Sequence, residues 1–376
     1  MKKRKYTRKY KLCLDVVQVM CDFCDLETQI NLISSCKEYN EYLKIRELDC
    51  SEGFGFKIIQ KISQQKKFSC VELDCSEFGF KITQEIIQQK KFDKLQILIA
   101  CNNTKITNVN HLQNTLTKLD CRYDCGIDQK GISALKVLQK LDAGNNSKII
   151  DVNHLQNTLT ELICWGNCCG IGQKGISALK VLQKLDAGNN SKIIDVNHLR
   201  NTLTELYCSL DCGIDQNGIS ELKVLLKLYA GYNSKIMDVN HLQNTLTELT
   251  CWYDCGIDQK GISELKVLQK LNACNNNKIT DVNHLRNTLT ELYCCSDECG
   301  IDQKGISELT KLQELNANDN SKITDVNHLQ NTLTELYCWY NCGIDQKGIA
   351  ELKVLQKLDA RNNWKITDVN VCLSKK

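Results

Sequence analysis

The sequence repeats itself at a fixed spacing, and this spacing constrains the fold more than any other feature of the chain. All six histidines fall at one phase of the repeat, 43 or 44 residues apart: His111, His154, His198, His241, His284 and His328. The segment VNHLQNTLTEL recurs almost letter for letter around them. A fixed period of this size is typical of stacked-repeat proteins, in which each unit packs only against its neighbours. The length of 376 residues therefore measures a number of repeats rather than a number of globular domains.

Each unit divides into two related halves, which are numbered here in steps from their first leucine. In one unit the recurring residues of the first half lie at steps 1, 4, 6, 10, 12, 17 and 20: Leu246, Leu249, Cys251, Cys255, Ile257, Ile262 and Leu265. Those of the second half lie at steps 1, 4, 6, 9, 12, 15 and 18: Leu268, Leu271, Ala273, Asn276, Ile279, Val282 and Leu285. Steps 4 and 6 share one face of a strand, because side chains alternate with a period of two. A single half cannot bury that face, so successive halves are expected to stack.

This pattern resembles the leucine-rich repeat, and the first half LTELTCWYDCGIDQKGISEL is similar to its cysteine-containing subtype. The resemblance covers residues 45 to 373. It implies an α/β fold, a leucine-rich-repeat solenoid of about 15 repeats over residues 45–376 with a parallel sheet on its concave face. Strands are expected to start near Ile45, Cys70, Leu95, Leu116, Leu138, Leu159, Leu182, Leu203, Leu225, Leu246, Leu268, Leu289, Leu312, Leu333 and Leu355.

An asparagine or aspartate recurs at step 9 of most halves, as in Asn233, Asp254 and Asn276. Its side chain can satisfy backbone groups of the turn that leaves the strand. In the first halves a cysteine follows at step 10 or 11, as Cys255 follows Asp254. In these halves the sequence leaves open whether the acidic or amide side chain or the cysteine points inward.

The 24 cysteines are expected to be reduced thiols, because the chain is long and shows no secretory signal. Pairs with C-x3-C spacing, such as Cys251 and Cys255, are expected to pack as small apolar residues, with disulfides or zinc as the alternatives. The histidines of successive units should lie about 10 Å apart, which is too far for a shared ion. We therefore expect no metal site and no cofactor. No catalytic motif emerges, and the chain is expected not to be an enzyme.

Steps 5, 7 and 8 vary between repeats, and in a solenoid these steps form the concave surface. Many of the residues found there are tryptophan, tyrosine or arginine, the types that dominate the energetic centres of protein interfaces. They predict a surface that binds a protein whose identity the sequence does not reveal; the alternative is neutral drift after recent duplication. The expected target-binding residues are Arg122, Tyr123, Trp165, Tyr207, Tyr229, Tyr232, Trp252, Tyr253, Tyr293, Tyr337, Trp339, Tyr340 and Arg361.

The charge and hydropathy of the chain do not favour nucleic acid or a membrane as its main partner. The formal net charge is +3 with 25% charged residues, so nucleic acid is not expected as the main partner. Residues 1–10 form a basic tail, which is either a solvated end or a nuclear import signal. No apolar run reaches the roughly 18 residues that a membrane span needs. The chain is expected to be soluble and intracellular, in the cytoplasm or the nucleus.

Residues 11–44 break the repeat and carry helical periodicity. This stretch resembles the F-box, whose pattern is matched by Leu12, Asp15, Val16, Phe23, Asp25, Leu26, Asn31, Leu32, Cys36 and Lys37, although Cys13 stands at the usual proline position. F-box and repeat combinations occur in eukaryotes and in large DNA viruses of amoebae, and the near-identical repeats resemble the viral ones. The resemblance implies docking on a Skp-type adaptor of a cullin-RING ubiquitin ligase through Leu12, Leu14, Val16, Phe23, Leu26 and Leu32.

On this interpretation the chain is the noncatalytic substrate receptor of an SCF-type ligase, and its repeats bind the protein to be ubiquitinated. The alternative is a stand-alone scaffold or inhibitor whose N-terminal helices only cap the first repeat. Solenoids need such a cap to shield the apolar end of the stack from water.

Overall fold

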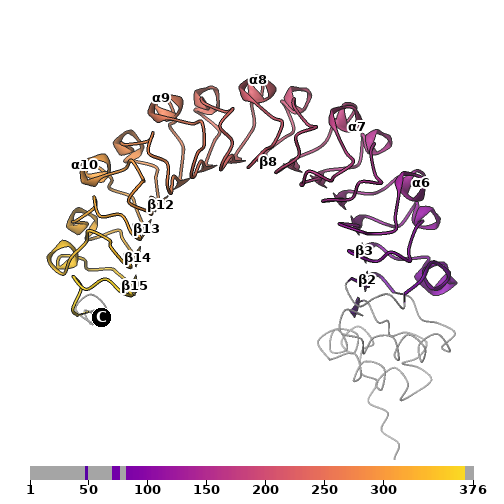
Figure 1. Ribbon diagram of the computed structural model, residues 1–376, viewed down its shortest axis with the longest axis horizontal. Helices are drawn as coiled ribbons and strands as arrows, with labels where there is room; N and C mark the ends of the chain where they lie inside the picture. Colours follow the sequence, from indigo (N-terminus) through magenta and orange to yellow (C-terminus); the bar gives the residue numbers. More distant parts are fainter. Residues whose placement is uncertain (1–46, 50–69, 77–81, 369–376) are drawn as a thin grey trace, which may run out of the picture. The chain divides into compact units, whose positions relative to one another are not determined.

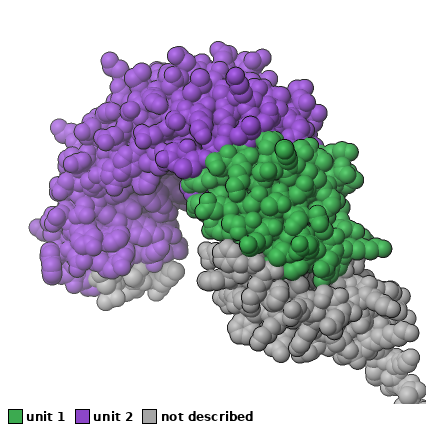
Figure 2. All heavy atoms as spheres, turned by 45° about the vertical axis from the view of Figure 1, so that its right-hand side comes forward, with its two compact units in different colours: residues 1–149 green, residues 150–376 purple. Residues whose placement is uncertain are grey.

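The computed structural model describes residues 47–49, 70–76 and 82–368, which form parts of two compact units, residues 1–149 and 150–376 (Figure 2). The basic tail and the F-box-like segment predicted from the sequence lie outside the described residues. Each unit is a stretch of leucine-rich-repeat solenoid, as the repeat pattern predicts.

Unit 1 contains five three-residue strands and four short helices. The strands are β1 (Glu47–Asp49), β2 (Glu72–Asp74), β3 (Ile97–Ile99), β4 (Lys118–Asp120) and β5 (Lys140–Asp142). The α-helices are α5 (Gln84–Ile87) and α6 (Gln129–Ile132), and the 3-10 helices are η2 (Lys90–Phe92) and η3 (Asn110–Leu112). These counts refer to the residues that the structure describes.

Unit 2 continues the same alternation over residues 150–368 with ten strands. They are β6 (Glu161–Ile163), β7 (Lys184–Asp186), β8 (Glu205–Tyr207), β9 (Lys227–Tyr229), β10 (Glu248–Thr250), β11 (Lys270–Asn272), β12 (Glu291–Tyr293), β13 (Glu314–Asn316), β14 (Glu335–Tyr337) and β15 (Lys357–Asp359). The α-helices are α7 (Gln173–Ile176), α8 (Gln216–Ile219), α9 (Gln259–Ile262) and α10 (Gln303–Ile306). The 3-10 helices are η4 (Asn153–Leu155), η5 (Asn197–Leu199), η6 (Asn240–Leu242), η7 (Asn283–Leu285), η8 (Asn327–Leu329) and η9 (Lys347–Ile349).

Within each unit every strand pairs in parallel with the next strand of the chain, and the step-4 leucines stand opposite each other. Leu249 of β10, for example, is in register with Leu228 of β9 and Leu271 of β11. All fifteen predicted strands are present at steps 3 to 5 of their repeats. In unit 2 the strands follow the inner side of a curve and the helices follow its outer side (Figure 1). The step-3 and step-5 side chains of these strands therefore lie on the concave side.

The interior of each coil holds the apolar residues of the repeat. In the unit that starts at Leu246, the leucines at steps 1 and 4, Cys251, Cys255 and Ile257 are all fully buried. Burying a leucine or isoleucine side chain stabilises a fold by about 1.5–3 kcal/mol, and every coil repeats this contribution. The apolar residues of the repeat are therefore nearly constant, because each side chain contacts the equivalent side chains in the coils before and after it.

The first-half helix α9 is fixed by a capping side chain and a close backbone approach. Asp258 precedes α9, and its carboxylate accepts a hydrogen bond of 2.9 Å from the Gly261 amide. A Cβ atom on Gly261 would lie 2.0 Å from the carbonyl oxygen of Met237 in the preceding coil. The glycine of the recurring QKGI segment is thus required because the backbones of successive coils meet there.

Step 9 of the second halves holds a buried asparagine that joins successive coils. The Asn276 side-chain nitrogen donates to the carbonyl oxygens of Cys251 at 2.8 Å and Ile257 at 3.1 Å, and its oxygen accepts from the Lys278 amide at 2.9 Å. The buried asparagines at this step are Asn103, Asn146, Asn190, Asn233, Asn276, Asn320 and Asn363. Each satisfies backbone groups that would otherwise be buried without partners.

The first halves use a cysteine where the second halves use this asparagine. Cys255 at step 10 is buried, whereas Asp254 at step 9 is exposed. The ammonium group of Lys278 donates to the Cys255 carbonyl at 2.9 Å from the next coil. The structure thereby decides the question that the sequence left open: asparagine points inward in second halves and cysteine in first halves.

Replacing Asn276 with alanine should destabilise unit 2 by about 3–5 kcal/mol, because two carbonyl groups and one amide lose their buried partner. Urea titration followed by circular dichroism measures the loss as a lower midpoint of the transition. Asn277→Ala is the matched control, since the side chain of Asn277 is exposed, and it should change stability by less than about 0.5 kcal/mol. Equal effects of the two variants would contradict the role assigned to Asn276.

Candidate protein-binding face

Along β7 to β12 the concave side of unit 2 carries charges that pair with one another. At step 3, lysines from second halves alternate with glutamates from first halves along β7 to β12. Neighbouring strands form the ion pairs Lys184–Glu205 at 2.8 Å, Lys227–Glu248 at 3.2 Å and Lys270–Glu291 at 2.8 Å. Partly exposed pairs of this kind stabilise little, on the order of 0.2–1 kcal/mol each. Their consequence is that the surface of β7 to β12 has no strong net charge.

Tyrosines at step 5 lie over this row of ion pairs. The rings of Tyr207 and Tyr229 stack, with centroids 4.1 Å apart and planes 3° from parallel. The Tyr207 hydroxyl donates to Glu205 at 2.8 Å, and the Tyr229 hydroxyl donates to Glu248 at 2.5 Å. Burial, followed by this bond to Glu248, raises the pKa of Tyr229. Both tyrosines are half-buried and held in place before any partner arrives.

The step-5 tyrosines nearer the C-terminus are held in the same way. Tyr293 donates to Glu314 at 2.5 Å, and Tyr337 donates to Glu335 at 2.9 Å. Burial is the main cause of a raised pKa at Tyr293, and the bond to Glu314 adds to it. The step-5 tyrosines thus form two separate groups along the sheet, one on β8 and β9 and one from β12 to β14.

An exposed aromatic patch follows the exits of β9 and β10; it consists of Tyr232, Trp252 and Tyr253. Tyr232 and Tyr253 stack at 4.6 Å, and the Trp252 ring lies 5.5 Å from Tyr253 and 6.0 Å from Tyr232. Trp252 is 37% exposed and each tyrosine is 39% exposed. The indole lies directly against Gly231, because a Cβ atom there would fall on the ring nitrogen of Trp252.

Step 8 has a left-handed backbone conformation throughout the described repeats. Asparagine, which tolerates this conformation, occupies step 8 in five second halves: Asn102, Asn145, Asn189, Asn275 and Asn362, with φ from 54° to 59°. In other halves bulky residues adopt it, including Tyr232 with φ of 61° and Tyr253 with φ of 54°. A bulky side chain in this region costs about 1–2 kcal/mol. The aromatic residues at step 8 are therefore kept against a local energetic cost.

A second aromatic patch lies at the exits of β14 and β15 and consists of Trp339, Tyr340 and Arg361. The rings of Trp339 and Tyr340 have centroids 5.4 Å apart, and the Arg361 guanidinium lies 4.7 Å from the centre of Trp339. A 2.8 Å ion pair with Asp359 holds Arg361 over the indole. Tyr340 is 48% exposed. The guanidinium and the carboxylate balance each other, so this patch also presents rings rather than net charge.

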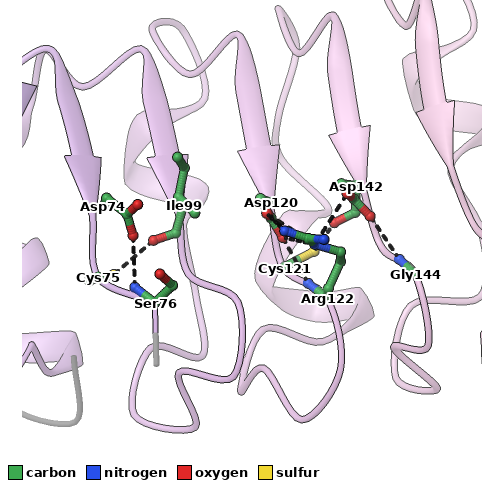
Figure 3. Close-up of polar contacts among 9 residues, drawn as sticks. All are labelled: Asp74, Cys75, Ser76, Ile99, Asp120, Cys121, Arg122, Asp142 and Gly144. Carbon is green, nitrogen blue, oxygen red and sulfur yellow. Dashed lines mark hydrogen bonds and ion pairs between the residues drawn. The ribbon is translucent and has the colours of Figure 1, made fainter. Parts of the chain in front are cut away.

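In unit 1 the expected arginine contact is already engaged within the protein. The Arg122 guanidinium contacts the Asp120 carboxylate at 2.7 Å and the Asp142 carboxylate at 3.2 Å (Figure 3). The hydrogen bonds to Asp120 are the main cause of a raised pKa at Arg122. Tyr123 is exposed beside it, with a left-handed φ of 58°. The Arg122 guanidinium is thus already paired with two carboxylates of the protein, whereas the Tyr123 ring is exposed to solvent.

The structure groups most of the residues predicted to contact a target but does not gather them into one site. In unit 2 they fall into the two patches and the two tyrosine groups, and Trp165 lies half-buried at the exit of β6. Arg122 and Tyr123 belong to unit 1. Within unit 2 the expected target-binding residues therefore lie in several clusters along the strands.

Several exposed apolar side chains were missed by the sequence analysis. Leu210 at step 8 is 48% exposed, and Trp364 is 87% exposed. Ile150, Ile194 and Met237 are more than half exposed, and they occupy equivalent positions of three repeats, shortly before the 3-10 helix of each repeat. The signal for Leu210 was its place in the variable step-8 series, whereas the others fall at steps outside the predicted binding surface.

The cysteines in the described residues are mostly buried core residues, as predicted. Burial raises the pKa of Cys125 to about 12 and the pKa values of Cys212 and Cys255 to about 11, so these thiols stay protonated at neutral pH. Cys168 is exposed. A disulfide joins Cys274 and Cys295, contrary to the expectation of reduced thiols throughout; two consecutive strands happen to carry cysteine at the same step.

The recurring histidines lie on the outer surface and tie successive halves together. His284 forms a 3.0 Å hydrogen bond through Nε2 with the Ile262 carbonyl at the end of α9, and His111, His198, His241 and His328 make equivalent bonds. Burial lowers the pKa of these five imidazoles, and the carbonyl bonds oppose that effect. Their role in the structure is to bond the end of the preceding helix.

Two further properties of the described residues bear on function. Within residues 47–49, 70–76 and 82–368, no three histidine, cysteine or acidic side chains converge as a metal site requires. Over that same part of the chain, every helix is too short or too polar to cross a membrane.

Acidification should destabilise the solenoid between pH 7.5 and 5.5. The folded-state pKa of the five histidines lies below the unfolded value of about 6.5, so the unfolded chain binds more protons in this window. The stability present above pH 6.5 is therefore lost as the pH falls towards the folded pKa. Urea unfolding at a series of pH values measures this loss, and His284→Gln should reduce its slope. Stability that rose on acidification would contradict this account.

Replacing Leu210 with asparagine should stabilise unit 2 by about 0.5–1 kcal/mol. Asparagine relieves the cost of the φ of 61°, and the 2.9 Å bond from the Leu210 amide to the Gly231 carbonyl is retained. Leu210→Ala is the control, because it removes the exposed side chain while the conformational cost remains. Thermal unfolding compares the two variants; a lower midpoint for the asparagine variant than for the alanine variant would refute the strain argument.

No protein-family model matches the sequence, and no curated protein matches it. Among solved structures, the chain is similar to the functional domain of InlJ from Listeria monocytogenes, which includes a cysteine ladder. The identity is 22% over 67% of this chain and 64% of that chain, with a TM-score of 0.39.

Two other solved structures are similar over more of this chain. The TLR13–ssRNA13 complex matches at 20% identity over 81% of this chain and 53% of that chain, with a TM-score of 0.45. The Rad7–Elc1 complex of yeast matches at 12% identity over 90% of this chain and 86% of that chain, with a TM-score of 0.41. The chain thus spans less than two thirds of the InlJ and TLR13 chains. Its own strand register and buried leucines establish the leucine-rich-repeat fold.

Proposed function

We propose that this chain is a protein-recognition module that binds its target through the concave side of unit 2, centred on Tyr232, Trp252 and Tyr253. The observation that carries the proposal is the combination of exposure and strain in these residues. Two of the three rings belong to residues with a left-handed backbone, and all three are more than a third exposed. Residues that are costly to the fold and open to solvent at one place are typical of binding surfaces.

The chemistry of the surrounding surface favours a partner that binds by aromatic and apolar contact. The lysines and glutamates beside the patch pair with each other, and the hydroxyls of Tyr207 and Tyr229 are bonded to glutamates. Binding should consequently depend only weakly on salt concentration, because few free charges contribute to it. Tryptophan and tyrosine contribute strongly to interface energies when a partner removes them from water.

We further propose that the target bound in this way is a substrate of an SCF-type ubiquitin ligase. The support is the F-box-like sequence of residues 11–44, with Leu12, Leu14, Val16, Phe23, Leu26 and Leu32 as the adaptor contacts. In such an assembly the chain contributes no chemistry of its own. It holds a lysine of the target near the charged ubiquitin carrier, and this proximity raises the rate. A scaffold or inhibitor with N-terminal capping helices would share the recognition face but not the adaptor.

The recognition proposal is tested with the full chain as bait in its host cells, by quantitative mass spectrometry of captured proteins. Trp252→Ala should lower capture of the specific target at least tenfold, since truncation of an interface tryptophan costs about 2 kcal/mol or more. Gly231→Ala should also lower capture, because its methyl group displaces the indole without removing it. Met237→Ala is the control, as Met237 is exposed but lies away from the strand face. A target captured equally by all four chains would rule out this surface.

The ligase proposal is tested separately from the recognition proposal, by capture of the adaptor. Full-length wild type and Phe23→Asp are compared for capture of a Skp-type adaptor, while the concave face is left intact. The wild type should bind the adaptor and the variant should not. If the wild type captures a target but no adaptor, the scaffold interpretation holds and recognition by unit 2 is unaffected.

A further inference from the structure

Cys274 and Cys295 differ from every other cysteine in the described residues because they are joined across two neighbouring coils on the strand face. The register of β11 and β12 pairs Asn272 with Tyr293, so the residues two positions later stand opposite each other. Their Cα atoms are 4.7 Å apart, although 21 residues separate them in the chain. In the part of the chain that the structure describes, this is the one place where consecutive halves both carry cysteine at step 7.

We propose that Cys274 and Cys295 form a redox-reversible cross-link, made by exchange with a low-molecular-weight disulfide such as oxidised glutathione and opened by the corresponding thiol. Cys274 is 5% exposed and Cys295 is half-buried, so a small disulfide reaches Cys295 first. The core cysteines do not compete, because they are enclosed by the coils. The pair is thus a site for a selective covalent modification.

The exchange takes place in two balanced steps. The Cys295 thiolate attacks one sulfur of oxidised glutathione, which forms a mixed disulfide and releases one glutathione thiolate that takes up a proton. The Cys274 thiolate then attacks the Cys295 sulfur and displaces the second glutathione. Two protein thiols lose two electrons and two protons in total, and one glutathione disulfide becomes two thiols. Excess reduced glutathione drives both steps in reverse.

The cross-link lies beside the aromatic patch and shares its backbone bonds. The Tyr253 amide donates to the Cys274 carbonyl at 2.8 Å, and the Asn275 amide donates to the Cys295 carbonyl at 3.1 Å. Both donors are step-8 residues with left-handed backbones. Closing the disulfide fixes the two carbonyls relative to each other and so stiffens the strand exits that hold Tyr253. This consequence for recognition rests on the proposed function, whereas the exchange chemistry does not.

The experiment uses the full chain with Cys168→Ser, which removes the one exposed free thiol of residues 82–368. The protein is equilibrated in a series of reduced and oxidised glutathione buffers, its free thiols are blocked under denaturing conditions, and it is digested with trypsin. Cys274 is the only cysteine of peptide 271–278, whereas Cys295 lies in peptide 287–304 with Cys294 and Cys299. The expected product is peptide 271–278 linked to peptide 287–304 through Cys295, present in oxidising buffer and lost in reducing buffer.

Oxidation should also raise Tm by about 3–6 °C, since the cross-link closes a loop of about 20 residues in the unfolded chain. Cys295→Ser should abolish both the linked peptide and the rise in Tm, whereas Cys101→Ser should retain both. The wild-type chain provides the peptide measurement even if a variant fails to fold. Absence of the linked peptide in oxidising buffer, a mixed glutathione adduct without the link, or a link that persists in fully reducing buffer would each overturn the proposal.

Discussion

The structure depends on one constraint: every coil must present the same apolar face, at the same register, to the coil before and after it. The step-4 leucines stand opposite each other from strand to strand, and the residues at steps 1, 4, 6 and 12 are buried without exception in the central units. A substitution in one coil changes its contacts with two neighbours, so the interior positions cannot vary independently. The near identity of the repeats at these interior positions follows from the contacts of each coil with its two neighbours.

Stacking also creates a polar problem, which side chains of the second halves solve for the first halves. Each turn after a strand buries carbonyl groups that have no partner in a sheet. The donors come from the second half that follows: Asn276 bonds the carbonyls of Cys251 and Ile257, and Lys278 bonds the carbonyl of the buried Cys255. Histidines such as His284 bond the end of the preceding helix on the outer surface. The repeated polar side chains thus serve as hydrogen-bond partners of the backbone. The recurrence of histidine and asparagine therefore does not indicate a catalytic or metal site.

The positions that are free to vary are those that face the hollow of the sheet, but they are not free of cost. Step 8 requires a left-handed backbone, which asparagine accepts in the second halves and which Tyr232 and Tyr253 adopt with strain. Step 7 requires room over the preceding strand, and Gly231 provides it for Trp252. A binding surface placed on these steps therefore rests on backbone features that the scaffold sets in every coil. The Cys274–Cys295 bond lies in the same series, one strand beyond Trp252.

The sequence by itself determined the repeat period, the fold class and the position of all fifteen strands, because each is a local periodicity that stacking makes obligatory. It also pointed to Trp252 and Tyr253 as side chains on the concave side. Only the tertiary structure decided which step-9 and step-10 residues turn inward, that Arg122 is paired with Asp120 and Asp142, and that the aromatic residues form separate clusters. It alone placed Cys274 against Cys295. These outcomes depend on contacts between coils that are about 20 residues apart in the chain. The spacing of residues within one coil does not show which side chain of a neighbouring coil each residue contacts.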